Sequence, residues 1–157
     1  MLRLITSIAV FVTLSAPAYG GWNYKENIDP FDDTDTSTVI ADPEDYSGTD
    51  VLVVAVKCQS DGLNLLLGHS YMSGNTNDQI KIQMRVDKEE PYSKLWSMSA
   101  SQKNSWMPMT DVRGMVAQMK AGNKLVVRAY DPYDGDTSTQ SLSLSGFSKQ
   151  VEKLSCY

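Results

Sequence analysis

An acidic stretch near the N-terminus, DDTDTSTVIADPE, has the ligand spacing of a calcium-binding loop. Asp33, Asp35, Ser37 and Glu44 fall at the first, third, fifth and twelfth positions of such a loop, and their oxygens suit a hard cation. The sharp turn at the sixth position normally needs glycine, whereas this chain has Thr38 there. We therefore expect an acidic, solvated loop without a metal, and treat these four residues as a weak calcium candidate.

A second stretch, RVDKEEPYSKLWSMS, brings an arginine, an aspartate and a tryptophan together. Arg85 and Asp87 are two residues apart, so in a strand they share one face. There they can form an ion pair, and Arg85 can also stack on Trp96. We expect a structural ion pair and a core tryptophan; a ligand or partner site is the alternative.

The single histidine, His69, limits metal and nucleophilic chemistry in this chain. Zinc sites of the usual type need several histidine or cysteine ligands. Ser70 follows His69 directly, and adjacent strand residues point to opposite faces, so the two do not form a catalytic pair. The sequence also has no G-x-S-x-G elbow, Walker loop or dinucleotide fingerprint. We expect a protein without catalytic residues or a cofactor.

The first 20 residues, MLRLITSIAVFVTLSAPAYG, have the pattern of a secretory signal peptide. A basic residue precedes an apolar run from Leu4 to about Leu14, and the small residues Ala18 and Gly20 suit a cleavage site. The run is shorter than the roughly 20 residues that cross a bilayer. We therefore expect residues 1–20 to be removed, leaving an exported chain with no transmembrane segment. A cut after Ala18 and an uncleaved N-terminal anchor are the alternatives.

The two cysteines, Cys58 and Cys156, are expected to form one disulfide, because an exported chain enters an oxidising compartment. Closing a loop of roughly 100 residues contributes about 4.7 kcal/mol in the loop-entropy model, less any native strain. A redox-active pair is the alternative, but such cysteines are usually close together, as in C-x-x-C.

These residues must be positioned by strands and helices, and the sequence pattern predicts one mainly β domain over residues 21–157. Its N-terminal segment, at about 21–50, is polar and acidic. Alternating or continuous apolar residues predict about six or seven antiparallel strands. They lie in TSTVIA, DVLVVAVKC, GLNLLLGHSYM, QIKIQMRVDK, KLWSMSA, NKLVVRAYD and TSTQSLSLSG. Helical spacing predicts one helix in TDVRGMVAQMKAG, with Thr110 as its cap and Gly122 as its stop, and a short one in FSKQVEKLSC. The fold class is β-sandwich-like, or an antiparallel sheet covered by helices.

The formal net charge of the chain is −5 at pH 7. A mildly acidic protein lacks the basic footprint of nucleic-acid binding, so we expect no nucleic-acid partner.

Four segments taken together resemble the periplasmic accessory family of type VI secretion, called TagO or VasI, and its relatives of unassigned or prophage role. These segments are DPFDD after an N-terminal tryptophan, DVLVVAVKC, MRVDKEEPYSKLWSMS and KLVVRAYDPYDGDTSTQSLSLSGFSKQVEKLSC. The resemblance implies a bridge between Cys58 and Cys156. It also implies structural roles for Arg85, Asp87 and Trp96.

Export, a single bridge and the family resemblance lead to one expected function. We expect a non-enzymatic binding or accessory protein of the bacterial envelope, periplasmic or secreted. Its partner would be a cell-envelope or secretion-system protein, or peptidoglycan. The alternative is a periplasmic inhibitor of a cell-wall-degrading enzyme, or a phage-related exclusion protein.

Overall fold

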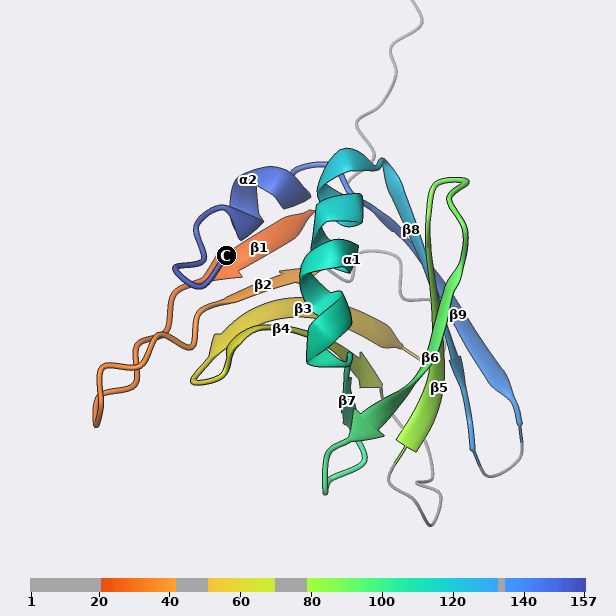
Figure 1. Ribbon diagram of the computed structural model, residues 1–157, viewed down its shortest axis with the longest axis horizontal. Coiled ribbons are helices and arrows are strands. Elements are labelled where there is room, and N and C mark those ends of the chain that lie inside the picture. The colour runs from red at the N-terminus through yellow and green to blue at the C-terminus, as the bar shows by residue number, and fades with distance from the viewer. Residues whose placement is uncertain (1–20, 42–50, 70–78, 133–134) are drawn as a thin grey trace, which may run out of the picture.

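In the computed structural model of this chain, the described residues form nine strands and two helices (Figure 1). The structure describes residues 21–41, 51–69, 79–132 and 135–157; the predicted leader, residues 1–20, and Glu44 lie outside them. The strands are β1 (Trp22–Lys25), β2 (Thr38–Ala41), β3 (Leu52–Gln59), β4 (Gly62–His69), β5 (Gln79–Val86), β6 (Tyr92–Met98), β7 (Asn104–Trp106), β8 (Lys124–Tyr130) and β9 (Thr137–Ser143). The helices are α1 (Met109–Ala121) and α2 (Phe147–Val151).

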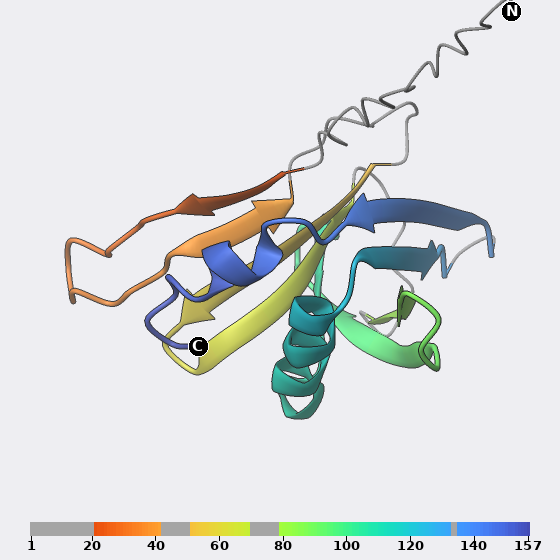
Figure 2. The same cartoon turned by 90° about the horizontal axis from the view of Figure 1, so that it is seen from above.

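All nine strands belong to one antiparallel sheet, in the order β1-β2-β3-β4-β7-β6-β5-β8-β9. Figures 1 and 2 show that the sheet bends strongly near the short strand β7, so its two halves face each other across α1. The sheet does not close into a barrel. The predicted class, a mainly β fold with an antiparallel sheet and two short helices, is confirmed.

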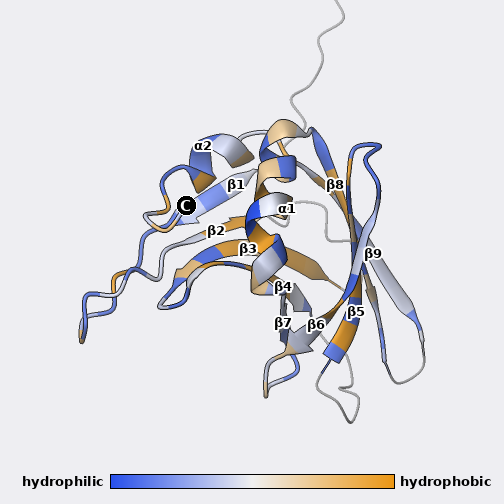
Figure 3. Cartoon of the chain, in the orientation of Figure 1, coloured by the Kyte–Doolittle hydropathy of each residue, from blue (hydrophilic) through white to orange (hydrophobic). Residues whose placement is uncertain are grey.

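The core lies between the facing halves of the sheet and α1. On β5 the even-numbered residues from Ile80 to Val86 are buried, while Lys81 and Arg85 are exposed, as strict alternation along a strand requires. Apolar residues gather on β3, β4 and β5 in Figure 3. Trp96 on β6 is fully buried in this core, so the expected core tryptophan is confirmed.

Helix α1 covers the core with the face that its spacing predicted. Its buried residues are Val112, Met115, Val116 and Met119. The predicted cap was wrong: the helix begins one residue earlier, at Met109 after Pro108, and no side chain caps it. Proline suits a helix start because it has no N–H to leave unpaired.

The disulfide joins Cys58 on β3 to Cys156, with a Cα–Cα distance of 5.7 Å. Helix α2 packs against β1 beside this bridge, and the rings of Trp22 and Phe147 meet edge to face at 4.6 Å. The bridge and this contact fasten the C-terminal end of the chain onto the first half of the sheet. The predicted disulfide is therefore confirmed.

Within the described residues, no helix combines the length and the apolar character that crossing a membrane requires.

Candidate functional site

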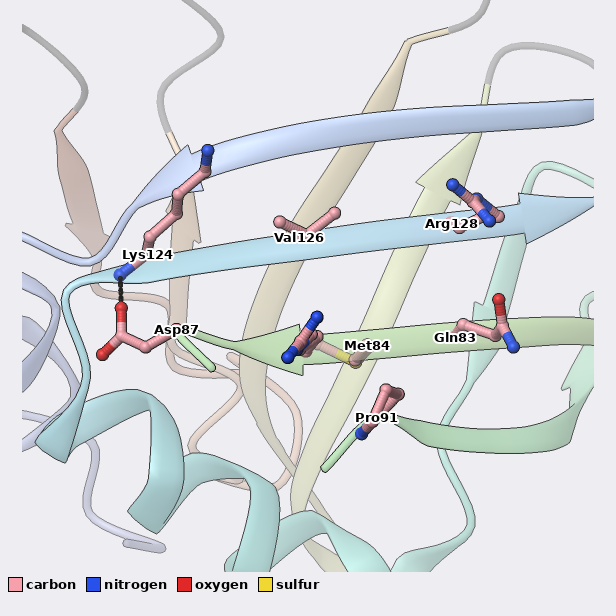
Figure 4. Close-up of a pocket in the computed structure, with 8 residues that line it drawn as sticks. Gln83, Met84, Asp87, Pro91, Lys124, Val126 and Arg128 are labelled. Carbon is pink, nitrogen blue, oxygen red and sulfur yellow. Dashed lines mark hydrogen bonds between the residues drawn. The ribbon is translucent and has the colours of Figure 1, made fainter. Parts of the chain in front are cut away.

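A groove of about 350 Å³ lies on the outer face of β5 and β8, the face opposite the core (Figure 4). Its lining combines cationic, polar and apolar residues from the two strands and from the turn after β5. The lining residues are Gln83, Met84, Arg85, Asp87, Pro91, Lys124, Val126 and Arg128. Two of the residues singled out in the sequence, Arg85 and Asp87, therefore belong to it.

The register between β5 and β8 brings the cationic residues together. Gln83 pairs with Arg128, and Arg85 pairs with Val126, two residues earlier on β8. Paired strand residues share a face, so Arg85 and Arg128 are diagonal neighbours, about 7–8 Å apart at their Cα atoms. Lys124 begins the same strand, on the same face. Three cationic residues thus line one groove.

Arg85 has a structural role as well as a place in the groove. Its Nε donates to the carbonyl of Glu89 at 3.0 Å, and a terminal nitrogen donates to the carbonyl of Lys88 at 3.2 Å. These bonds close the turn between β5 and β6. A guanidinium has five N–H donors, so further donors of Arg85 are available to a ligand.

Asp87 does not form the expected ion pair with Arg85. Strand β5 ends at Val86, and Asp87 has a φ of 48°, which turns its side chain out of the strand alternation. Its carboxylate instead accepts the backbone N–H groups of Asn123, at 3.0 Å, and Lys124, at 2.9 Å. Asp87 therefore holds the start of β8, as the dashed line in Figure 4 shows.

The connection that Asp87 holds also requires a glycine. A Cβ added to Gly122 would lie 2.1 Å from Cγ1 of Val86 and 3.2 Å from Oδ2 of Asp87. Real Cβ atoms do not approach other atoms so closely, so only glycine lets the end of α1 pass this near to β5. The tight passage places Lys124 at the rim of the groove.

Arg128 projects from β8 towards the neighbouring strand β9. Its Nε donates to the Oγ1 of Thr139 at 3.0 Å, and among the described residues no partner is seen for the terminal nitrogens of the guanidinium, which can therefore receive a ligand. Among the described residues the ion pairs are Lys94–Asp111 and Lys120–Glu152. No described carboxylate therefore forms an ion pair with Arg85 or Arg128, although Asp87 lines the same groove.

The electrostatic character of the groove follows from these bonds. The carboxylate of Asp87 is already occupied by backbone N–H groups, whereas the guanidinium groups retain unused donors. Guanidinium groups bind carboxylate and phosphate oxygens through two parallel hydrogen bonds. The arrangement is therefore suited to binding an oxyanion.

The described part of the acidic N-terminal stretch shows how three of the four calcium candidates are placed. Hydrogen bonds from Ser155 and then Ser37 hold the pKa of Asp35 below its usual value. Ser37 is fully buried, whereas Asp33 is exposed at a φ of 57°. The described residues contain no group of three or more histidine, cysteine or acidic side chains that could hold a metal. The fourth residue of this weak calcium candidate, Glu44, lies outside them, so the expectation of a loop without a metal stays a prediction.

His69 lies on the inner side of β4, opposite Leu52, with only 6% of its surface exposed. Neither ring nitrogen has a hydrogen-bond partner among the described residues. Burial lowers the pKa of His69, and the negative charge of Asp131 opposes this only in part. Burial in the fold therefore favours the neutral form of the histidine.

Sequence reasoning missed Arg128, Lys124 and Thr139. A signal for the first two was present, because KLVVRAY alternates two cationic residues with buried Leu125 and Val127. Their meeting with Arg85 depends on the pairing of β5 with β8, which no local pattern contains.

No protein-family model, curated protein or solved structure matches this chain.

Proposed function

We propose that this chain is an exported, non-enzymatic binding protein of the bacterial envelope, which uses the groove between β5 and β8 to capture an oxyanion-bearing partner. The observation that carries the proposal is the pair of arginines in that groove. Arg85 and Arg128 have unused N–H donors and no carboxylate partner among the described residues.

Two further features support the envelope as the place of action. The disulfide between Cys58 and Cys156 suits an oxidising compartment, and the first 20 residues have a leader pattern. The resemblance to the type VI secretion accessory family adds the kind of partner: a secretion-system protein, another envelope protein or peptidoglycan.

The test is a periplasmic crosslinking pull-down with the mature chain as bait and captured partners identified by mass. Arg128→Gln removes one groove cation, and Lys149→Gln removes an equal charge from the exposed surface of α2. We expect capture of a defined envelope component by the native chain and the Lys149 variant. Capture by the Arg128 variant should fall about tenfold, the loss of one charge-assisted hydrogen bond.

Other outcomes would change the proposal in defined ways. Equal capture by both variants would mean that the groove is not the binding site. Capture of a cell-wall-degrading enzyme, together with stoichiometric inhibition of that enzyme, would favour the inhibitor role. If the native chain captures nothing above a control bait of the same charge, the binding role is wrong.

A further inference from the structure

Strand β9 forms one edge of the sheet, and within the part of the chain that the structure describes its backbone from Thr137 to Leu142 bonds only to β8. It has seven residues, TSTQSLS, with no charged residue and no proline, and it pairs with β8 in an unbroken register. Edge strands are usually blunted by charges, prolines or bulges, because their unpaired backbone attracts another strand. The opposite edge, β1, is shorter, ends in Lys25 and has α2 packed against it (Figures 1 and 2).

The hydrogen bonds at the two ends of the β8–β9 pair show which backbone groups face outward. Asp131 donates to Asp136, and Leu144 donates to Asn123, so these are hydrogen-bonded pairs. Such pairs alternate along an antiparallel ladder. The backbone N–H and C=O groups that point away from β8, towards the open edge, therefore belong to Thr137, Thr139, Ser141 and Ser143. The indole N–H of Trp22 donates to the carbonyl of Ser143. Among the described residues, the backbone groups of Thr137, Thr139 and Ser141 form no backbone hydrogen bond outside the sheet.

A positive charge lies beside the middle of this edge, at Arg128, whereas Asp136 precedes the strand at its N-terminal end. Arg128 lies behind Thr139 and is bonded to its hydroxyl, so its guanidinium reaches across β9 towards the open edge. Thr139 and Ser141 are exposed and have small side chains, which leave room for the side chains of an added strand on the same face of the sheet. A residue added opposite Thr139 would place its side chain on the same face as Arg128. A carboxylate at that point would complement the arginine.

We propose that the β9 edge takes up an additional strand, supplied by an extended acidic segment of a partner protein. Backbone hydrogen bonds to Thr137, Thr139 and Ser141 supply the attachment, and a carboxylate on Arg128 supplies selectivity. A second copy of this chain fits less well, because edge-to-edge pairing would join two cationic faces in one sheet. The inference deepens the proposed binding role by naming the chemistry of the partner.

The experiment places a photo-crosslinking residue at Thr137, on the open edge, in the full chain exported in cells. The same residue at Gln118, exposed on α1, is the position control. Ser141→Pro removes an outward N–H, and Ser141→Ala keeps it. We expect a discrete adduct at Thr137 that maps to an acidic segment of another protein, is lost in Ser141→Pro and persists in Ser141→Ala.

A direct binding measurement follows with a synthetic peptide of the mapped segment. Its fluorescence anisotropy should give an affinity about tenfold weaker for Arg128→Gln than for the native chain. Thermal unfolding of each variant separates loss of binding from loss of fold. If Ser141→Pro does not fold, the peptide affinity of Arg128→Gln still tests whether the segment binds beside Arg128.

Several outcomes would overturn the inference. They are an adduct only with a second copy, an adduct only with glycan, no adduct at Thr137, or an affinity unchanged by Arg128→Gln. The proposed function fails separately. If the pull-down captures an envelope partner while Thr137 yields no adduct, the binding role stands and the edge is not its site.

Discussion

The carboxylate of Asp87 is predicted to contribute stability by holding the start of β8, and three substitutions at this residue separate its roles. Asp87 accepts the backbone N–H groups of Asn123 and Lys124 and also has a positive φ of 48°. Alanine loses the hydrogen bonds and disfavours this backbone conformation. Glycine loses the bonds but accepts the conformation, whereas asparagine keeps one acceptor oxygen and tolerates the conformation.

The expected magnitudes follow from the exposure of the site. Asp87, Asn123 and Lys124 are all exposed, so water replaces part of each lost bond. We therefore take the low end of the usual range, roughly 0.5–1 kcal/mol for each of two bonds. The left-handed conformation adds about 1 kcal/mol for alanine. Asp87→Ala should lower the free energy of unfolding by about 2–3 kcal/mol, glycine by about 1–2 and asparagine by about 1.

Urea unfolding followed by tryptophan fluorescence measures these differences, because Trp96 is buried in the core. The order asparagine, glycine, alanine, from least to most destabilised, is the diagnostic result. A glycine variant as stable as the native chain would show that the carboxylate does not hold the start of β8. An alanine variant as stable as the native chain would refute both parts of the reasoning.

Three further predictions concern stability. Reducing the disulfide, which spans 98 residues, should lower the free energy of unfolding by about 4 kcal/mol in urea titrations with and without reductant; an unchanged midpoint would contradict it. Gly122→Ala should destabilise the fold by roughly 1–3 kcal/mol through overpacking against Val86. Gly114→Ala, in open space on α1, should stabilise it by about 0.5–1 kcal/mol; the same sign for both would refute this contrast. Because burial depresses the pKa of His69, its stabilising contribution is present above about pH 6.5 and falls as the pH drops below that value. His69→Leu should flatten thermal unfolding midpoints between about pH 7 and 5, and an unchanged slope would exclude this histidine as the cause.

The longer elements could be predicted because their patterns are local. Residues 80–86 alternate strictly, and residues 109–121 repeat at helical spacing, so β5 and α1 follow from sequence alone. The strands that were missed, β1 and β7, have four and three residues. The equally short β2 was predicted because Val39 and Ile40 are β-branched, whereas WNYK and NSW have no such pair, and these strands form because neighbouring strands supply their hydrogen bonds.

Only part of the candidate site could be predicted, because its residues meet through contacts between distant parts of the chain. Arg85 and Asp87 stood out as a pair, but Asp87 binds backbone groups 36 and 37 residues further along the chain. Arg128 joins Arg85 only through the register of β5 with β8. An ion pair between Arg85 and Asp87 was the natural expectation from spacing. The left-handed turn at Asp87 removed it, and so left Arg85 without a carboxylate partner among the described residues.

The whole chain is acidic while its groove is cationic, and this difference in charge affects which partner the groove would select. The chain has a formal net charge of −5, so a partner that is acidic throughout would be repelled at long range. At physiological ionic strength the Debye length is about 8 Å, which screens that repulsion but not a contact pair at Arg128. Selection therefore depends on where a partner's carboxylates lie rather than on its total charge. An extended segment with acidic side chains on one face satisfies this condition, because it matches Arg128 while its backbone completes the β9 edge.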